Sequence, residues 1–235
     1  MNGEIKLPPR LALIADLVPG GTRLADVGSD HALLPIRLLM KGVIRSAVAT
    51  DIHAGPIKRA EANARRYGVT GLRCVQCDGL AAVSPEEADT VVIAGMGGET
   101  IAGILRAAPW VCEDRLLILQ PMSRPEILRE TLSALGLRIE TERLVEDSGR
   151  IYAVLTARTG VQEPFSEAET YVGIYPLVSR EPLFDRFLGS WEKRIDTAVN
   201  GLAGSGKQED AARLRYARDL REQMKEMRER YAHSR

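Results

Sequence analysis

Cysteine is scarce in this sequence, and long apolar runs are absent. The 235 residues include 3 cysteines, and no stretch has the roughly 18 consecutive apolar residues of a membrane span or the apolar core of a secretion signal. We therefore expect a soluble, cytoplasmic protein whose thiols stay reduced. Net charge is absent too, since 32 Lys and Arg balance 32 Asp and Glu. The total gives no indication of a polyanionic partner, although it is compatible with a local basic face.

Cys74 and Cys77 form a C-x-x-C pair, which raises the question of a metal site. A structural zinc ion needs four ligands, and the remaining cysteine, Cys112, is distant in sequence. Both residues also fall in an expected strand, where positions i and i+3 point to opposite faces. We interpret them as small buried hydrophobic residues and predict no metal.

From residue 20 onward, apolar runs alternate with stretches of helical periodicity, after a short helix expected over 8–18. The runs are continuous rather than alternating with polar residues, which is typical of parallel strands buried on both faces. This pattern predicts an α/β fold with a doubly wound sheet. The expected strands are 23–27, 46–50, 72–77, 90–94 and 116–120, and the expected helices are 33–41, 56–67, 98–107 and 125–135.

Two further strands, 137–146 and 150–158, are separated only by a turn around Ser148. A connection this short cannot hold a crossover helix, so the pair must be antiparallel. Five parallel strands followed by an antiparallel hairpin form the Rossmann-like sheet of class I S-adenosylmethionine methyltransferases. Dehydrogenase Rossmann domains do not end in this way. We therefore expect that fold over residues 1–160.

Residues 161–235 have a different pattern, and we expect a separate helical domain there. Apolar residues recur at alternating steps of four and three, as in a coiled-coil seam. Gly201 and the 204–206 stretch are expected to break the helix, so that two arms of about 30 Å fold back as an antiparallel hairpin over 181–232. The first seam is Phe184, Leu188, Trp191, Ile195, Ala198 and Leu202, and the second is Leu214, Ala217, Leu220, Met224, Met227 and Tyr231.

The second arm carries an excess of basic residues, which is compatible either with a solvated helix face or with a binding surface. These residues are Arg213, Arg215, Arg218, Arg221, Lys225, Arg228 and Arg230.

Polar or glycine residues follow four of the expected strands, at the edge of the sheet where ligands bind. Gly28 allows close approach of a ligand to the backbone. Asp51 can accept both hydroxyls of a ribose, and Asp78 can accept a hydrogen bond from an adenine amine. The glycine-rich segment 94–98 opens the fourth strand end. A dinucleotide is disfavoured, because G-x-G-x-x-G is absent after the first strand.

Each of these features alone is weak, since an acid that ends a strand is commonly a cap of the following helix. Four such features in register on consecutive strands favour a ligand site. The segments that carry them are ADVGSDHALLP, TDIHAGP, CDGL, IAGMGGETI, LILQP and GRIYAVL.

In this order these segments resemble the bacterial TrmK family, whose members are tRNA methyltransferases acting on N1 of adenine 22. The resemblance spans about residues 5–160, and the helical tail is similar to the coiled-coil domain of that family. It implies S-adenosylmethionine as cofactor, tRNA as partner and a tRNA-binding role for 161–235. It also implies a cofactor and target-base pocket formed by Gly28, Ser29, Asp30, Asp51, Asp78, Gly79, Ala94, Gly95, Met96 and Gly97.

Three positions depart from the family pattern. Asp51 stands where the family usually has glutamate, Met122 replaces an asparagine and Ala153 replaces a glutamate. The last two bear on the target base rather than on the cofactor. As candidate substrate contacts we assign Arg10, Gln120, Pro121, Arg215 and Arg218.

Methylation of adenine N1 needs no general base, because N1 has a free lone pair. The product is a cation, so a carboxylate near the reacting atoms would stabilise the charge as it forms. Asp30 is the candidate, and His31 could hydrogen-bond the base or cap the helix. The alternative for Asp30 is likewise a helix cap without ligand contact.

Other methylation chemistries fit less well. The Asn/Asp-Pro-Pro-aromatic motif of amino methylation is absent, and Cys77, the candidate nucleophile for pyrimidine C5, is expected to point into the core. The leading hypothesis is thus a tRNA adenine-N1 methyltransferase, for which we favour a monomer. The alternatives are a methyltransferase of another RNA or of a small molecule, and an inactive RNA-binding or scaffold protein.

Overall fold

The structure is a computed structural model that describes residues 5–205 and 208–234. The chain divides into two compact units. The N-terminal unit comprises the residues up to Thr141 together with Val145–Gln162, and the C-terminal unit comprises Glu142–Leu144 and Glu163–Arg235. None of the described helices is long and apolar enough to cross a membrane.

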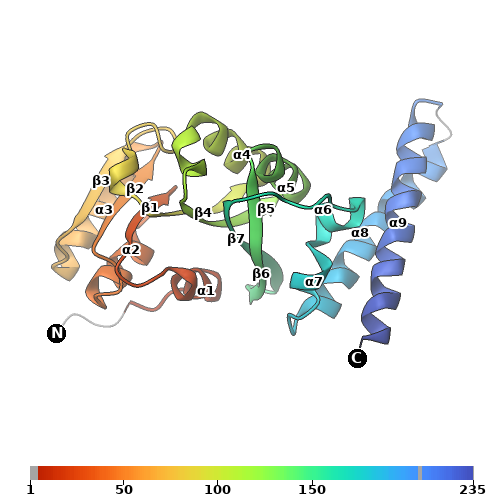
Figure 1. Cartoon of the computed structure of the whole chain (residues 1–235), viewed down its shortest axis with the longest axis horizontal. Coiled ribbons are helices and arrows are strands. Elements are labelled where there is room, and N and C mark those ends of the chain that lie inside the picture. The colour runs from red at the N-terminus through yellow and green to blue at the C-terminus, as the bar shows by residue number, and fades with distance from the viewer. Residues whose placement is uncertain (1–4, 206–207, 235) are drawn as a thin grey trace. The chain divides into compact units, whose positions relative to one another are not determined.

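The N-terminal unit is built on a seven-stranded sheet with the order β3-β2-β1-β4-β5-β7-β6 (Figure 1). The first five strands in this order are parallel, and β7 pairs antiparallel with β5. This confirms the predicted class I methyltransferase fold. The strands are β1 (Arg23–Val27), β2 (Ser46–Asp51), β3 (Leu72–Gln76), β4 (Thr90–Gly97), β5 (Leu116–Ser123), β6 (Leu137–Asp147) and β7 (Arg150–Thr159).

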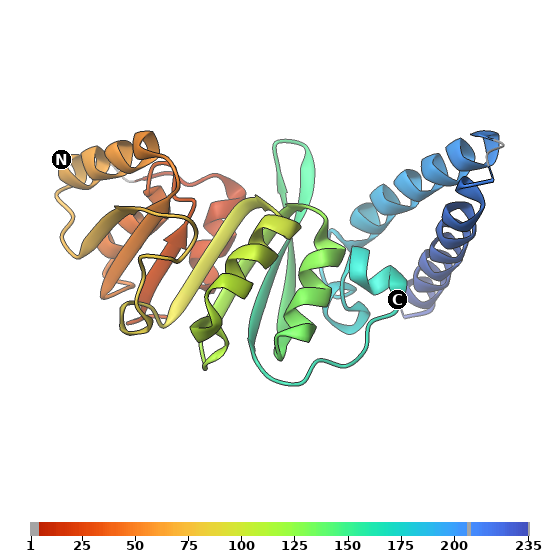
Figure 2. The same ribbon diagram turned by 90° about the horizontal axis from the view of Figure 1, so that it is seen from above.

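Helices cover both faces of this sheet (Figure 2). Leu24 and Ile118 belong to a core cluster with Ile14 and Ile36 of α1 and α2. The alternate strand residues, such as Val91 and Leu117, are equally buried on the opposite face, where α4 and α5 lie. The helices of this unit are α1 (Pro9–Leu17), α2 (Leu33–Met40), α3 (Ala54–Tyr67), α4 (Gly98–Ala107) and α5 (Pro125–Ala134), with short 3₁₀ turns η1 (Pro85–Glu87) and η2 (Pro109–Cys112).

The register of the parallel strands brings their carboxyl ends to one edge. Val27 pairs with Thr50 and with Ile93, and Thr50 pairs with Val75. The segments that follow β1, β2 and β3 and the end of β4 therefore meet at the same edge of the sheet, as the sequence predicted.

The prediction for the C-x-x-C pair was wrong in part. Cys74 and Cys77 are only partly buried, because β3 is the edge strand of the sheet. Cys77 lies just beyond the end of β3, where its thiol donates to the carbonyl of Gly79 at 3.5 Å. The described residues contain no group of three His, Cys, Asp or Glu side chains that could hold a metal ion.

The C-terminal unit consists of α6 (Glu167–Val172), α7 (Tyr175–Val178), α8 (Phe184–Ser205) and α9 (Asp210–His233). Helices α8 and α9 form an antiparallel pair, in which the start of α8 meets the end of α9. There Phe184 packs edge to face on Tyr231, with ring centroids 4.8 Å apart.

Two details of the predicted hairpin need correction. Helix α8 continues to Ser205, so Gly201 and Gly204 lie within it and do not end it, while Gly206 lies outside the described residues. A helical glycine costs about 1 kcal/mol, which an exposed final turn tolerates. The buried face of α8 also differs from the predicted seam, because Ala198 is exposed and Val199 is buried in its place.

Candidate active site

The loop after β1 is organised by a buried carboxylate. The hydroxyl of Ser29 donates to Asp26, and both side chains are buried. Burial raises the pKa of Asp26 to about 6, although the hydrogen bond from Ser29 opposes this rise. The amides of Gly28 and Ser29 both donate to the carbonyl of Thr50, at 2.8 and 3.0 Å. The first loop is thereby fixed against the end of β2.

Asp30 and His31 follow this loop and are exposed to solvent. The Asp30 carboxylate forms an ion pair with Arg59 of α3, and His31 Nε2 lies 3.2 Å from the same carboxylate. The hydrogen bond from Arg59 lowers the pKa of Asp30. The N-cap of α2 is Ala32, and no side chain caps this helix. The cap interpretation is therefore wrong for Asp30 and for His31.

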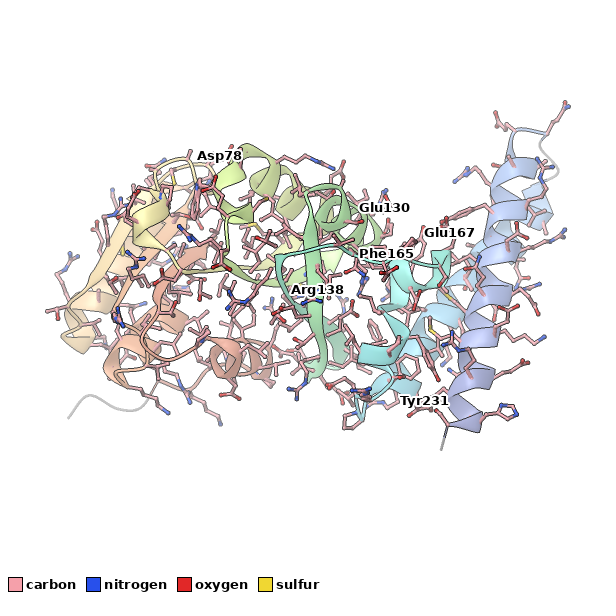
Figure 3. All side chains as sticks on the ribbon, in the orientation of Figure 1. Asp78, Glu130, Arg138, Phe165, Glu167 and Tyr231 are labelled. Carbon is pink, nitrogen blue, oxygen red and sulfur yellow. The ribbon has the colours of Figure 1, made fainter. Side chains whose placement is uncertain are left out.

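The ends of β2 and β3 present the next two predicted carboxylates. Asp51 is half-buried and accepts a hydrogen bond from the amide of His53 at 2.8 Å, which shapes the turn into α3. Asp78 is exposed at the surface of this unit (Figure 3). Gly79 adopts a φ of 54°, and its carbonyl accepts from the hydroxyl of Thr50 at 2.8 Å. A cavity of about 430 Å³ lies between Asp78, Gly79 and helix α4.

Strand β4 does not end at residue 94 as predicted but continues to Gly97, with irregular register opposite β5 around Met96. Gly95 has a φ of 79°, a conformation that favours glycine. A Cβ added to Gly28 would clash with Cε of Met96, so these two strand ends are in close contact. The predicted segment 94–97 is thus beside the first loop.

The structure also brings together two predicted substrate contacts. Arg10 of α1 donates to Oε1 of the fully buried Gln120 at 2.6 Å, and the amide of Gly95 donates to the same oxygen at 3.1 Å. The Arg10 guanidinium also stands 5.6 Å from the ring centroid of Tyr152 and 3.8 Å from the Asp147 carboxylate.

Pro121 follows Gln120 and is buried, whereas Met122 is exposed and its sulfur lies 3.7 Å from Arg10. This group, which we call the Arg10 cluster (Arg10, Gln120, Met122, Asp147, Tyr152), borders the end of β4. Sequence reasoning did not single out Tyr152 or Asp147 as site residues, although Tyr152 belongs to the GRIYAVL segment.

The remaining predicted substrate contacts, Arg215 and Arg218, lie on α9 in the C-terminal unit, and both are exposed. Other members of the basic row pair with acids. Arg228 contacts Asp185 and Glu192 of α8 at 2.7 and 2.6 Å.

Comparison with known protein families shows to which class of proteins the N-terminal unit belongs. A family model described as a methyltransferase domain matches residues 7–155. These residues include every strand end of the site, so the N-terminal unit is a methyltransferase domain.

Individual relatives narrow the class. The tRNA (adenine(22)-N(1))-methyltransferase of Bacillus subtilis is 37% identical over 163 residues, which cover 67% of each protein. The crystal structure of the B. subtilis m1A22 tRNA methyltransferase TrmK has a TM-score of 0.87 and 29% identity, over 95% of this chain and 99% of that one. Sp1610 of Streptococcus pneumoniae, solved with S-adenosyl-L-methionine, has a TM-score of 0.78 and 32% identity, over 93% and 97%. The chain belongs to the tRNA (adenine(22)-N(1))-methyltransferase family, which confirms the resemblance noted in the sequence.

Proposed function

We propose that this protein transfers a methyl group from S-adenosylmethionine to N1 of adenine 22 in tRNA. The observation that carries the proposal is the 37% identity to the B. subtilis enzyme over two thirds of the chain. The strand-end site supports it, because its side chains have the chemistry that this cofactor requires.

The acceptor groups at the strand ends match the hydrogen-bond donors of S-adenosylmethionine, one strand after another along the sheet edge. The carboxylate of Asp51 would accept the ribose hydroxyls, and that of Asp78 would accept the adenine amine, beside the cavity that contacts α4. Gly28 has a φ of 74°, which turns the first loop so that its backbone can approach the amino-acid end of the cofactor. Ser29, Gly79 and residues 94–97 complete the same surface.

When bound, the cofactor supplies a methyl group activated on a sulfonium. The lone pair of adenine N1 forms the new bond to carbon, and the electron pair of the broken bond stays on sulfur. Positive charge thereby passes to the base. Asp30 is a carboxylate at neutral pH, since its ordinary pKa is 3.8 and the hydrogen bond from Arg59 lowers the pKa further, and it would stabilise this charge. His31, next to that carboxylate, would orient the base.

The target adenine would lie against the Arg10 cluster and Pro121. Gln120 is held by Arg10 and by the amide of Gly95, so its position is fixed before substrate arrives. The ring of Tyr152 offers a surface on which an extruded base can stack. Met122 would add apolar contact where the family usually has an amide.

We assign residues 1–160 to catalysis and residues 161–235 to tRNA binding, in a protein that acts as a monomer. A pocket at the strand ends is too small to recognise a tRNA, whose backbone and shape extend far beyond the target base. Arg215 and Arg218 are exposed on α9, and we propose that they contact phosphates.

The test of the proposed function is methyl transfer. Purified protein, methyl-labelled S-adenosylmethionine and unmodified tRNA transcripts should give labelled tRNA. A transcript with adenine 22 replaced by guanine should stay unlabelled, and equal labelling of both transcripts would contradict the assigned position.

A further inference from the structure

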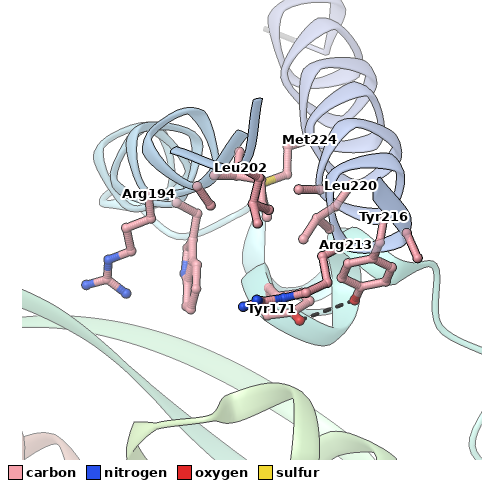
Figure 4. Close-up of a pocket in the computed structure, with 12 residues that line it drawn as sticks. Tyr171, Arg194, Leu202, Arg213, Tyr216, Leu220 and Met224 are labelled. Atoms are coloured by element: carbon pink, nitrogen blue, oxygen red, sulfur yellow. Dashed lines mark hydrogen bonds between the residues drawn. The ribbon is translucent and has the colours of Figure 1, made fainter. Parts of the chain in front are cut away.

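A groove of about 460 Å³ lies within the C-terminal unit, between α8, α9 and α6 (Figure 4). Its volume falls within the range of about 300–1,000 Å³ that is typical of small-ligand sites. We call it the hairpin groove. Its walls carry the rings of Tyr171, Trp191 and Tyr216, with aliphatic side chains of both long helices behind them, and Arg194 and Arg213 also line it.

The groove exists because the packing of α8 on α9 changes along the pair. At one end, large side chains such as Phe184 and Tyr231 fill the interface. Further along, Ala198 of α8 and Ala212 of α9 line the groove in their place, and both are exposed. Short side chains on both helices leave a space that the neighbouring residues do not fill.

The aromatic walls are held in defined orientations. Tyr171 and Trp191 meet edge to face, with centroids 5.6 Å apart. The hydroxyls of Tyr171 and Tyr216 lie 3.2 Å apart, and Tyr216 also donates to Glu167 at 2.9 Å. Although its hydroxyl is anchored in this way, Tyr216 is 45% exposed, so its ring remains accessible from solvent.

The described residues that line the groove include two guanidiniums and no carboxylate. The nearby carboxylate of Glu167 accepts the hydrogen bond of the Tyr216 hydroxyl. The guanidinium of Arg194 stands over the Trp191 ring, 4.7 Å from its centroid, and Arg213 contacts Asp210 at 3.1 Å. The indole N–H of Trp191 is buried and finds no acceptor within the described part of the chain. The groove thus combines aromatic surfaces with cations.

A ligand that suits both features has a flat unsaturated ring and a nearby negative charge. A nucleotide of RNA has this composition, since unpaired bases stack on aromatic side chains and on arginine. We propose that the hairpin groove binds an unpaired nucleobase of the tRNA, with Arg194 and Arg213 on the adjoining phosphates. The proposal rests on tRNA as the substrate, and it adds a base contact separate from the strand-end site.

Tryptophan fluorescence tests this proposal directly, because the chain has only two tryptophans. In a full-length Trp110→Phe protein, Trp191 is the single reporter. Titration with a tRNA transcript should quench its emission, and a short single-stranded adenylate should do so as well. A fully paired RNA duplex should not, because its bases are not free to stack.

Variants of the groove separate stacking from general attraction. Tyr216→Ala should weaken tRNA binding about tenfold, the usual effect of one lost base–aromatic stack. Tyr216→Phe keeps the ring and should restore binding. Ala198→Leu fills the groove without removing a contact and should weaken binding similarly, which covers the case in which Tyr216→Ala fails to fold. Arg194→Ala should reduce the salt dependence of binding more than the matched change Lys193→Ala.

Several outcomes would overturn the proposal. They are unquenched Trp191 emission at saturating tRNA, equal affinity of Ala198→Leu and the parent, and failure of the parent to bind tRNA. Concentration-dependent dimerisation that is lost in Ala198→Leu would instead make the groove a contact between two copies of the chain. Binding is measured without methyl transfer, so a protein that binds tRNA through the groove and does not methylate it would contradict only the proposed function.

Discussion

Ser29 donates its hydroxyl hydrogen bond to Asp26, a carboxylate that is buried beneath the first loop of the active site. Asp26 lies on the sheet face that carries α1 to α3, between Ala49 of β2 and Val92 of β4. A carboxylate in such apolar surroundings is stabilised mainly by this hydrogen bond, so the loop and the ionisation of Asp26 are linked.

This linkage predicts a pH-dependent stability. The folded pKa of Asp26, about 6, exceeds its ordinary value of 3.8. The contribution of Asp26 is therefore fully present below about pH 4 and is lost as pH rises through about 6, by about 3 kcal/mol. The free energy of unfolding, measured with urea across this pH range, should fall by about 3 kcal/mol more for the parent than for Asp26→Asn, whose side chain cannot ionise. Parallel stability curves for the two proteins would contradict the burial of a charge at this position.

Asp51 and Asp78 should control cofactor affinity. Loss of a partner for a ribose or adenine group costs about 1–3 kcal/mol, so alanine at either position should weaken S-adenosylmethionine binding about tenfold or more. Asp51→Glu keeps the carboxylate and has the side chain that the family usually has, so it serves as the matched control. Calorimetry that finds both alanine variants binding like the parent would place the cofactor elsewhere.

Asp30→Asn should reduce turnover rather than cofactor affinity, in contrast to the alanine variants of Asp51 and Asp78. It keeps the size of the side chain and removes the charge, and Asp30 does not cap α2. If the carboxylate stabilises the developing cation, kcat should fall by about two orders of magnitude. The affinity for S-adenosylmethionine should change little. Near-normal turnover, measured with saturating tRNA, would exclude a catalytic role for the Asp30 carboxylate and leave only its ion pair with Arg59.

The basic row of α9 should divide into two groups. Arg215 and Arg218 are exposed and lie off the buried seam, so reversing both charges should weaken tRNA binding and flatten its salt dependence without unfolding the helix pair. Arg228 is the contrasting position, since it bridges Asp185 and Glu192. Arg228→Glu should lower the melting temperature. Unchanged tRNA affinity and salt slope in the Arg215→Glu, Arg218→Glu protein would make this helix face merely solvated.

The sequence predicted the ends of β1, β2 and β3 to within one residue because the signals there are local, whereas β4 and β5 each continue three residues further than predicted. A buried run followed by an acid or a glycine defines a position such as Asp51 without knowledge of its neighbours. Pairs that depend on packing were not predictable. Arg59 is 29 residues from Asp30, and Arg10 is 110 residues from Gln120. Helix placement over the sheet creates both contacts.

The error at Cys77 has a similar origin. Apolar composition predicted a buried strand, but only the strand order shows that β3 is at the edge. The hairpin groove could not be predicted from the sequence either. The apolar residues of α8 and α9 have the same heptad spacing as those of two closely packed helices. The openness of the groove comes from the small size of Ala198 and Ala212, which heptad spacing does not reveal.

The identity of the methylated nucleoside decides whether this protein methylates N1 of adenine. Transfer RNA that the protein has labelled should be digested to nucleosides and separated by mass spectrometry. We expect 1-methyladenosine, because N1 can attack without a general base and Asp30 would stabilise the cation formed there. Label in N6-methyladenosine, in a methylated pyrimidine or in no nucleoside at all would contradict it.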